Sequence, residues 1–194
     1  PQEYSDANKW PVYMHVDPER WSVGQYGQPD GWSRHIYHDG MLDMWWHTIS
    51  HKDLKWKDYA CLMEMLKQKL NIDEDCIYLY GMCANGIATM ALAVKYPDQW
   101  AECLFSTGNS YRHLAGNTLN LSIICDNEYI ESEGLSAYLD FAVKCFDYYG
   151  CRNFMHTTTQ NASYSRGAFI PRTIRNKNPY RVLYTIELLA NPRS

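Results

Sequence analysis

The sequence predicts an α/β fold built on a mostly parallel sheet. Short apolar runs rich in β-forming residues alternate with longer segments whose apolar residues recur every three or four positions. The run at 76–80 lacks polar alternation, which is typical of a strand buried on both faces. Strands separated by helices pair in parallel, because a crossover helix is what returns the chain to the start of a parallel neighbour. We therefore expect three layers, with helices on both faces of the sheet.

Five strands are predicted in chain order. Residues 10–16 form a β-rich run bounded by polar turn segments, and residues 34–38 form a weaker candidate strand. The strand at 76–80 breaks sharply at Gly81. The remaining strands are expected at 101–106, 121–125 and 153–159.

Three helices are predicted between these strands. Residues 56–70 carry an apolar stripe at helical spacing and end at Asn71. Residues 84–96 are mostly good helix formers and are followed by Pro97. Residues 134–149 repeat the stripe and stop at Gly150, which is typical of a glycine that ends a helix.

Length and composition exclude several classes of protein. The 194 residues predict one domain, and 46% hydrophobic with 21% charged residues excludes disordered, collagen-like and coiled-coil chains. The net charge of −4, with no basic run interleaved with aromatics, excludes a nucleic-acid-binding role. No apolar run approaches the ~20 residues of a membrane span. Because the chain begins with Pro1, we expect it to be processed, or a fragment of a longer polypeptide.

The cysteines favour a reducing interior. Their number is odd, and they form neither a C-x-x-C pair nor a Cys/His metal spacing, so neither disulfides, a metal nor a cofactor is expected. Most lie in apolar runs, where a thiol behaves as a small hydrophobe. The seven are Cys61, Cys76, Cys83, Cys103, Cys125, Cys145 and Cys151.

The segment from Gly81 to Gly86 carries the strongest functional signal. It joins a strand directly to a helix, and such a tight turn needs small neighbours around its central residue, Cys83. A side chain at that point projects above the first turn of the helix, whose free N–H groups and dipole favour negative charge. The sequence therefore predicts a thiol with a depressed pKa at Cys83 and an oxyanion-binding N–H at Ala84.

This turn resembles the nucleophile elbow, G-x-S-x-G, of the α/β-hydrolase superfamily. The resemblance extends in order through residues 71–81 (NIDEDCIYLYG) and 91–101 (ALAVKYPDQWA), which are similar to a block of polyhydroxybutyrate depolymerase-like and feruloyl esterase-like hydrolases, relatives of the prolyl oligopeptidase group. Dienelactone hydrolases of the same superfamily also carry cysteine at this position. The resemblance implies a three-layer α/β-hydrolase-like fold, Cys83 as nucleophile and a small-molecule ester as substrate, and it allows secretion.

The resemblance also implies an acid and a histidine after the nucleophile. Residues 121–125 and the turn that follows place Glu128 at the acid position, with Asp126 as a competitor, although either could be an ordinary solvated turn residue. The family histidine is expected after the next strand, where residues 159–163 contain none. His156 falls inside the predicted strand, and a strand histidine with a satisfied hydrogen bond is the alternative to a catalytic base.

Two further positions depart from the family pattern. His15 stands where a histidine precedes the glycines of the oxyanion loop, but Val16, Asp17 and Pro18 replace those glycines. Asn85 occupies a position where glycine is expected. These departures and the missing histidine predict that the site is incomplete.

Two other interpretations concern the first half of the chain. His47 and His51 are four positions apart, but without a third ligand we expect no metal there. A group of aromatic residues predicts core or lid packing rather than a carbohydrate platform: Trp32, Tyr37, Trp45, Trp46 and Trp56.

Two functions remain open. One is an esterase- or peptidase-like hydrolase that acts through Cys83 with an unconventional base, such as His156 or a first-half histidine. The other is a hydrolase fold that has lost catalysis and binds ligands or packs against other domains or chains of a larger assembly. Residues 175–185 resemble the segment that leads, in these esterase-like proteins, into a further β module, which favours the second.

Overall fold

A computed structural model describes the sheet, its helices and one segment of the tail. The described residues are 4–18, 41–48, 56–81, 84–105, 112–126, 136–151, 154–157 and 174–177.

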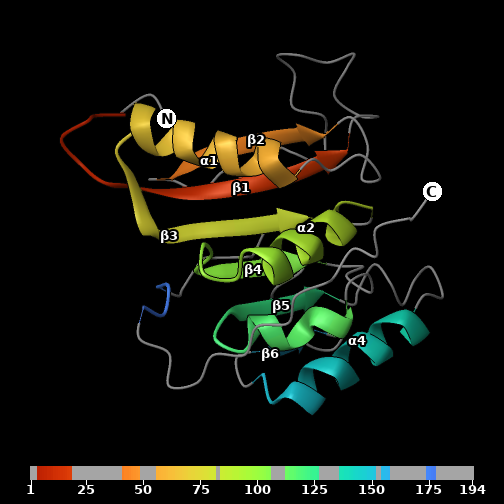
Figure 1. The fold of residues 1–194 in the computed structure, drawn as a ribbon. Helices are drawn as coiled ribbons and strands as arrows, with labels where there is room; N and C mark the ends of the chain where they lie inside the picture. The colour runs from red at the N-terminus through yellow and green to blue at the C-terminus, as the bar shows by residue number, and fades with distance from the viewer. Residues whose placement is uncertain are drawn as a thin grey trace, which may run out of the picture.

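Six strands form one sheet in the order β2-β1-β3-β4-β5-β6, and every neighbouring pair is parallel (Figure 1). The strands are β1 (Trp10–Pro18), β2 (Leu42–Thr48), β3 (Ile72–Gly81), β4 (Glu102–Phe105), β5 (Ser122–Asp126) and β6 (Phe154–Thr157). The predicted α/β class with a parallel sheet is therefore confirmed. Its consequence for function is that the carboxyl ends of all six strands lie along one edge.

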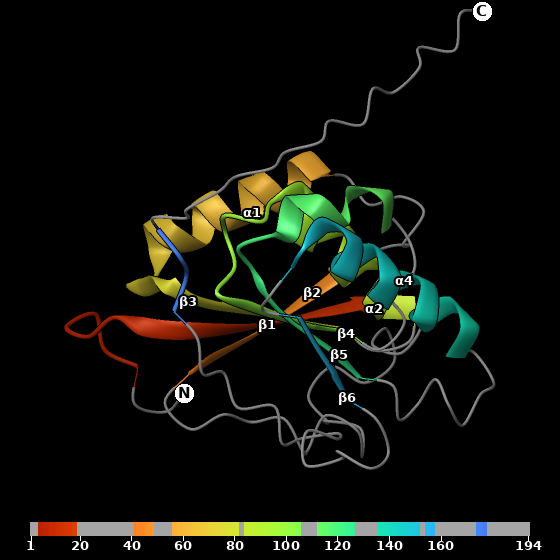
Figure 2. The same ribbon diagram turned by 90° about the horizontal axis from the view of Figure 1, so that it is seen from below.

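The described helices lie together on one face of the sheet (Figure 2). They are α1 (Trp56–Lys69), α2 (Ala84–Lys95), the 3-10 helix η2 (Arg112–Thr118) and α4 (Ser136–Tyr149). The second helical layer, expected on the opposite face, is not among the residues that the structure describes. No helix in the described part of the chain is long and apolar enough to cross a membrane.

The core lies between the helices and one face of the sheet. Alternate residues of β1, β3, β4 and β5 point into it, as period-two geometry requires. From the sheet these are Val12, Met14, Val16, Ile77, Leu79, Cys103, Phe105, Ile123 and Cys125. The helices add Tyr59, Met63, Leu66, Met90, Leu92, Val94, Leu114 and Phe146. A second, smaller cluster on the opposite face contains Tyr13, Tyr78, Leu104 and Ile124.

Two elements of the structure were not predicted. Strand β2 was not predicted, although Trp45, Trp46 and Thr48 are good strand formers. The 3-10 helix η2 was not predicted either, because so short a helix depends on tertiary contacts. The weaker candidate strand at 34–38 lies outside the described residues.

Strand β3 begins earlier than predicted because it contains an irregularity. Trp10 pairs with Ile72 and Val12 pairs with Ile77. Between these two pairs β1 advances by two residues and β3 advances by five, so β3 carries extra residues. The extra residues include the acidic run Asp73–Asp75, which has no paired residue in β1. An acidic run of this kind is not typical of a buried strand, so the sequence placed the start at Cys76.

Candidate active site

The predicted elbow lies between β3 and α2. Strand β3 ends at Gly81 and α2 begins at Ala84, so only two residues separate the strand from the helix. Those two residues, Met82 and Cys83, lie outside the described residues. The predicted order of a strand followed closely by a helix is confirmed, and the shape of the turn and the position of the Cys83 side chain stay predictions.

Helix α2 is held firmly behind this turn. Five consecutive residues, Met90 to Val94, have no exposed surface. Near its carboxyl end, Asn117 Nδ2 donates to the Val94 carbonyl oxygen at 2.9 Å and Trp100 Nε1 donates to the Leu92 carbonyl oxygen at 3.4 Å. These side chains stabilise carbonyl groups near the carboxyl end of the helix. The other end of α2 follows the turn, and the first N–H groups of a helix have no partner within it and favour negative charge.

The acid position lies two strands from the elbow. Asp126 is the last residue of β5, and its Cα is paired with that of Thr157 in β6. The strand order places β4 between β3 and β5, so Asp126 lies at the same edge of the sheet as the elbow. Glu128, the other acid candidate, lies outside the described residues.

His156 occupies a strand position, as the sequence predicts. It is the third residue of β6, and its Cα is paired with that of Cys125 in β5. The pair Asp126–Thr157 follows it, so His156 lies one step back from the last pair of the ladder. His156 therefore lies within the sheet and not in the loop after β6, where the family histidine is expected. The residues after Thr157 where the family histidine is expected, 159–163, lie outside the described residues.

His15 is packed among aromatic rings. Its side chain is 2% exposed, and it pairs in register with Tyr80, the residue before Gly81. The imidazole meets the Tyr13 ring edge-on at 4.7 Å between centroids and the Tyr80 ring edge-on at 5.6 Å. His15 therefore lies on β1, beside the last residues of β3 and next to the predicted elbow.

The segment after His15 is a strand and not a loop. Val16, Asp17 and Pro18 continue β1 and pair with Trp46, His47 and Thr48 of β2. A β-branched valine suits an extended strand, and proline has no N–H to donate. This segment therefore lacks the glycine-rich turn that directs a second N–H towards an oxyanion.

The cysteines that the structure describes include both buried and exposed thiols. Burial raises the pKa of the Cys103 thiol well above its ordinary value, and it also raises the pKa of Cys151. Cys151 further contacts Thr118 Oγ1 at 3.9 Å and the Ala115 carbonyl oxygen at 3.6 Å. Cys61 is exposed on α1. The buried thiols have the environment of inert structural cysteines.

No metal centre is found in the described part of the chain, where no three His, Cys, Asp or Glu side chains gather closely enough to hold an ion. His47 lies in β2, and His51 lies outside the described residues. The expectation that this pair holds no metal is therefore not tested.

A buried polar row on the second face of the sheet was not predicted. Tyr13, Tyr78, Glu102 and Ser122 are paired in register across four strands, and Ser122 Oγ donates to Glu102 Oε2 at 2.9 Å. Glu102 is only 4% exposed, and burial raises the pKa of the Tyr78 hydroxyl. The signal in the sequence was the single carboxylate inside the apolar run 101–105.

Comparison with known proteins gives a structural likeness. No protein-family model and no curated protein sequence matches the chain. Among solved structures, the chain is similar to the crystal structure of a thermostable esterase, with a TM-score of 0.53 and 12% sequence identity. The match covers 81% of this chain and 48% of the esterase, so the chain spans about half of that protein's length. The chain therefore has an esterase-like α/β fold.

Proposed function

We propose that this chain is an α/β-hydrolase-like domain, related to esterases and peptidases, whose Cys-His-acid site is incomplete and whose catalysis is weak or lost. The observation that carries the proposal is the register of β6, in which His156 pairs with Cys125 inside the sheet. The sequence contains no histidine between Thr157 and the last residue, Ser194. The position after β6 that should supply the base is thus without an imidazole.

A base is needed even at a favourable helix terminus. The dipole of α2 can stabilise a thiolate at Cys83, but acyl transfer also needs a proton for the leaving group. The carboxylates at Asp126 and Glu128 would orient an imidazole rather than replace it. A second part of the site is also missing. Strand β1 continues through Pro18, so no glycine-rich turn offers a second N–H to an oxyanion, which leaves Ala84 as the expected donor.

The same domain has a role without turnover. A fold of this kind can bind a small-molecule ester without cleaving it, or serve as a packing surface for other domains or chains.

A second candidate function rests on His15. Because His15 pairs with Tyr80 on the strand next to β3, it is the described histidine closest in register to the elbow. An active esterase would use Cys83 as nucleophile and an unconventional base, His15 or His156. This candidate requires that the His15 imidazole turn out of its contacts with Tyr13 and Tyr80.

Hydrolysis of p-nitrophenyl acetate tests the proposal. The wild-type chain is compared with Cys83→Ala, and Cys61→Ala is the matched control for the background reaction of an exposed thiol with an activated ester. A positioned base contributes about 100- to 10,000-fold, so a working site stands far above that background. We expect wild type and Cys83→Ala to turn over at similar slow rates. A large loss of turnover in Cys83→Ala, with Cys61→Ala unaffected, would show an active enzyme.

A further inference from the structure

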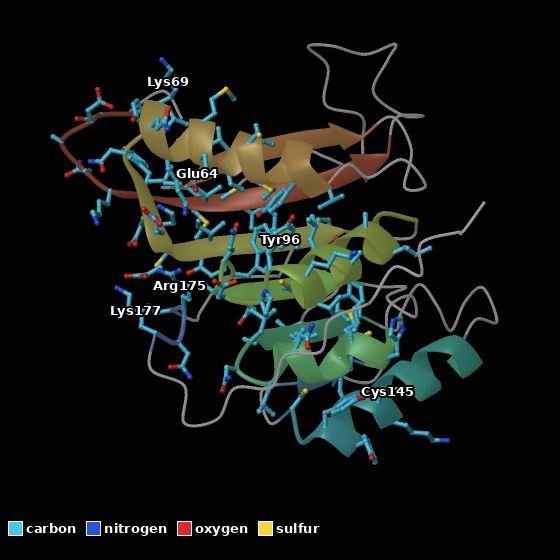
Figure 3. The ribbon with its side chains drawn as sticks, in the orientation of Figure 1. Glu64, Lys69, Tyr96, Cys145, Arg175 and Lys177 are labelled. Carbon is cyan, nitrogen blue, oxygen red and sulfur yellow. The ribbon has the colours of Figure 1, made fainter. Side chains whose placement is uncertain are left out.

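Two cations from the tail converge on one carboxylate of β3. Arg175 Nη2 donates to Asp75 Oδ1 at 3.0 Å, and the Lys177 ammonium forms an ion pair with Asp75 Oδ2. Figure 3 shows Arg175 and Lys177 next to each other beside the amino-terminal end of β3. The Arg175 backbone N–H also donates to the Asp75 carbonyl oxygen at 2.9 Å. A segment 100 positions further along the chain is thus attached to the start of the central strand.

Arg175 reaches a second element as well. Its Nη1 donates to the Asp98 carbonyl oxygen at 3.0 Å, in the turn between α2 and β4. The planar guanidinium binds the two acceptors at once through two different nitrogens. Residues 174–177, which we call the strap, therefore join β3 to the turn that follows α2.

The described contacts of the strap are polar. Ile174 is 70% exposed, so its apolar side chain contributes little burial. Asn176 and Lys177 are also exposed, and Asp75 is about one-quarter exposed. Contacts of this kind weaken when a charge is removed or screened by salt.

The two acidic residues before Asp75 bind other groups. Glu74 Oε2 forms an ion pair with Lys67 Nζ of α1 at 2.9 Å. Asp73 Oδ1 accepts a hydrogen bond from the Asp75 backbone N–H at 3.1 Å. The carboxylate of Asp75 is therefore the one that binds both strap cations.

We propose that the strap is an electrostatic latch on Asp75, and that neutralising Asp75 releases residues 174–177 while the sheet remains folded. The latch lies at the amino-terminal end of β3, opposite the elbow. Its release can therefore be followed independently of any activity at Cys83.

Hydrogen exchange of the Arg175 amide is the direct readout, because that N–H is bonded to the Asp75 carbonyl oxygen. Asp75→Asn keeps the size of the side chain and removes its charge, and Glu74→Gln is the matched control on the next residue. We expect Asp75→Asn to accelerate exchange at Arg175 by about two- to thirty-fold, the range for loss of two partly exposed ion pairs. Exchange in Glu74→Gln should equal wild type, and amides of the core strands should stay protected in both variants.

Two further measurements keep the test decisive. In the wild-type chain, 1 M NaCl should accelerate exchange at Arg175 without any substitution, because salt screens exposed pairs. Trypsin should cleave after Arg175 and Lys177 faster in Asp75→Asn than in Glu74→Gln, as mass spectrometry of the fragments would show. Equal exchange and cleavage in wild type and Asp75→Asn would overturn the latch. So would an equal acceleration in Glu74→Gln, because the effect would then be a general one of surface charge.

Discussion

At the scale of single residues, surroundings set the chemistry of each thiol. Cys103 is fully enclosed on β4, and burial raises its pKa well above the ordinary value. Cys83 differs by its predicted place at the amino end of α2, where helix N–H groups and the dipole stabilise a thiolate. We therefore expect the chain to hold thiols of opposite reactivity, whether or not it is catalytic.

Iodoacetamide labelling of the native chain should reveal that difference. Because the thiolate is the reacting species, we expect Cys83 to be alkylated faster than the other six cysteines and Cys103 to be the slowest. Peptide mass spectrometry after timed quenching gives each rate. Labelling of Cys83 as slow as that of Cys103 would show a buried, inert thiol at the elbow.

Asp75 should contribute to stability in a pH-dependent way. The Lys177 ammonium, and after it the Arg175 guanidinium, lower the pKa of the Asp75 carboxyl from its ordinary value of 3.8. A lowered folded-state pKa means that the stabilisation is complete above the unfolded-state value and is lost as the pH falls through the folded-state value.

Urea unfolding at several pH values measures this contribution. Asp75→Asn should be less stable than wild type at pH 7, by a small amount because the ion pairs are partly exposed to solvent. The difference should vanish at pH values below the lowered pKa. A difference that persists unchanged in acid would argue against an ionic origin.

At the scale of elements, local signals predicted the centre of the fold better than its edges. The elbow, α2 and β5 follow from apolar runs, a glycine break and helix-forming residues, all of which are local. Strand β2 and η2 depend on neighbours that the local pattern does not reveal. The start of β3 was missed because Asp73–Asp75 are carried in an irregularity that only pairing with β1 defines.

The end of α4 shows a local signal that the structure confirms in detail. Gly150 has a φ of 74°, the Gly150 N–H donates to the Asp147 carbonyl oxygen and the Cys151 N–H donates to the Phe146 carbonyl oxygen, both at 3.0 Å. These bonds form the Schellman motif, which ends a helix on a left-handed residue. The motif also brings Cys151 back towards the core.

Gly150→Ala should therefore destabilise the fold through the backbone alone. A Cβ at this position would meet nothing within 4 Å, so no steric clash contributes. The left-handed conformation should cost about 1–2 kcal/mol of unfolding free energy for alanine. Asparagine tolerates this conformation better, so Gly150→Asn should lose less in urea unfolding. Equal stability of wild type and Gly150→Ala would mean that the last turn of α4 is not fixed in this geometry.

At the scale of the whole molecule, the parallel sheet decides which residues can form a site. Its carboxyl edge brings together the end of β3, Asp126 on β5 and the end of β6. The sequence predicted the strands that precede the elbow and the acid position because each is a recognisable apolar run, and the roles of Cys83, Asp126 and Glu128 stay predictions. It also placed His156 inside a strand, but only the register with Cys125 fixes how far that residue lies from the end of the ladder. Register is a property of two segments, so no single stretch of sequence encodes it.

We propose that Cys83 has no histidine base. The most direct test is the pH dependence of the Cys83 alkylation rate, measured from pH 4 to pH 10 in wild type, His156→Gln and His15→Gln. We predict a single ionisation, lowered from the free-thiol value of about 8.5 by the helix terminus and equal in all three chains. Two ionisations in wild type, reduced to one when either histidine is replaced in a chain that remains folded, would reveal a thiolate–imidazolium pair and would contradict the account.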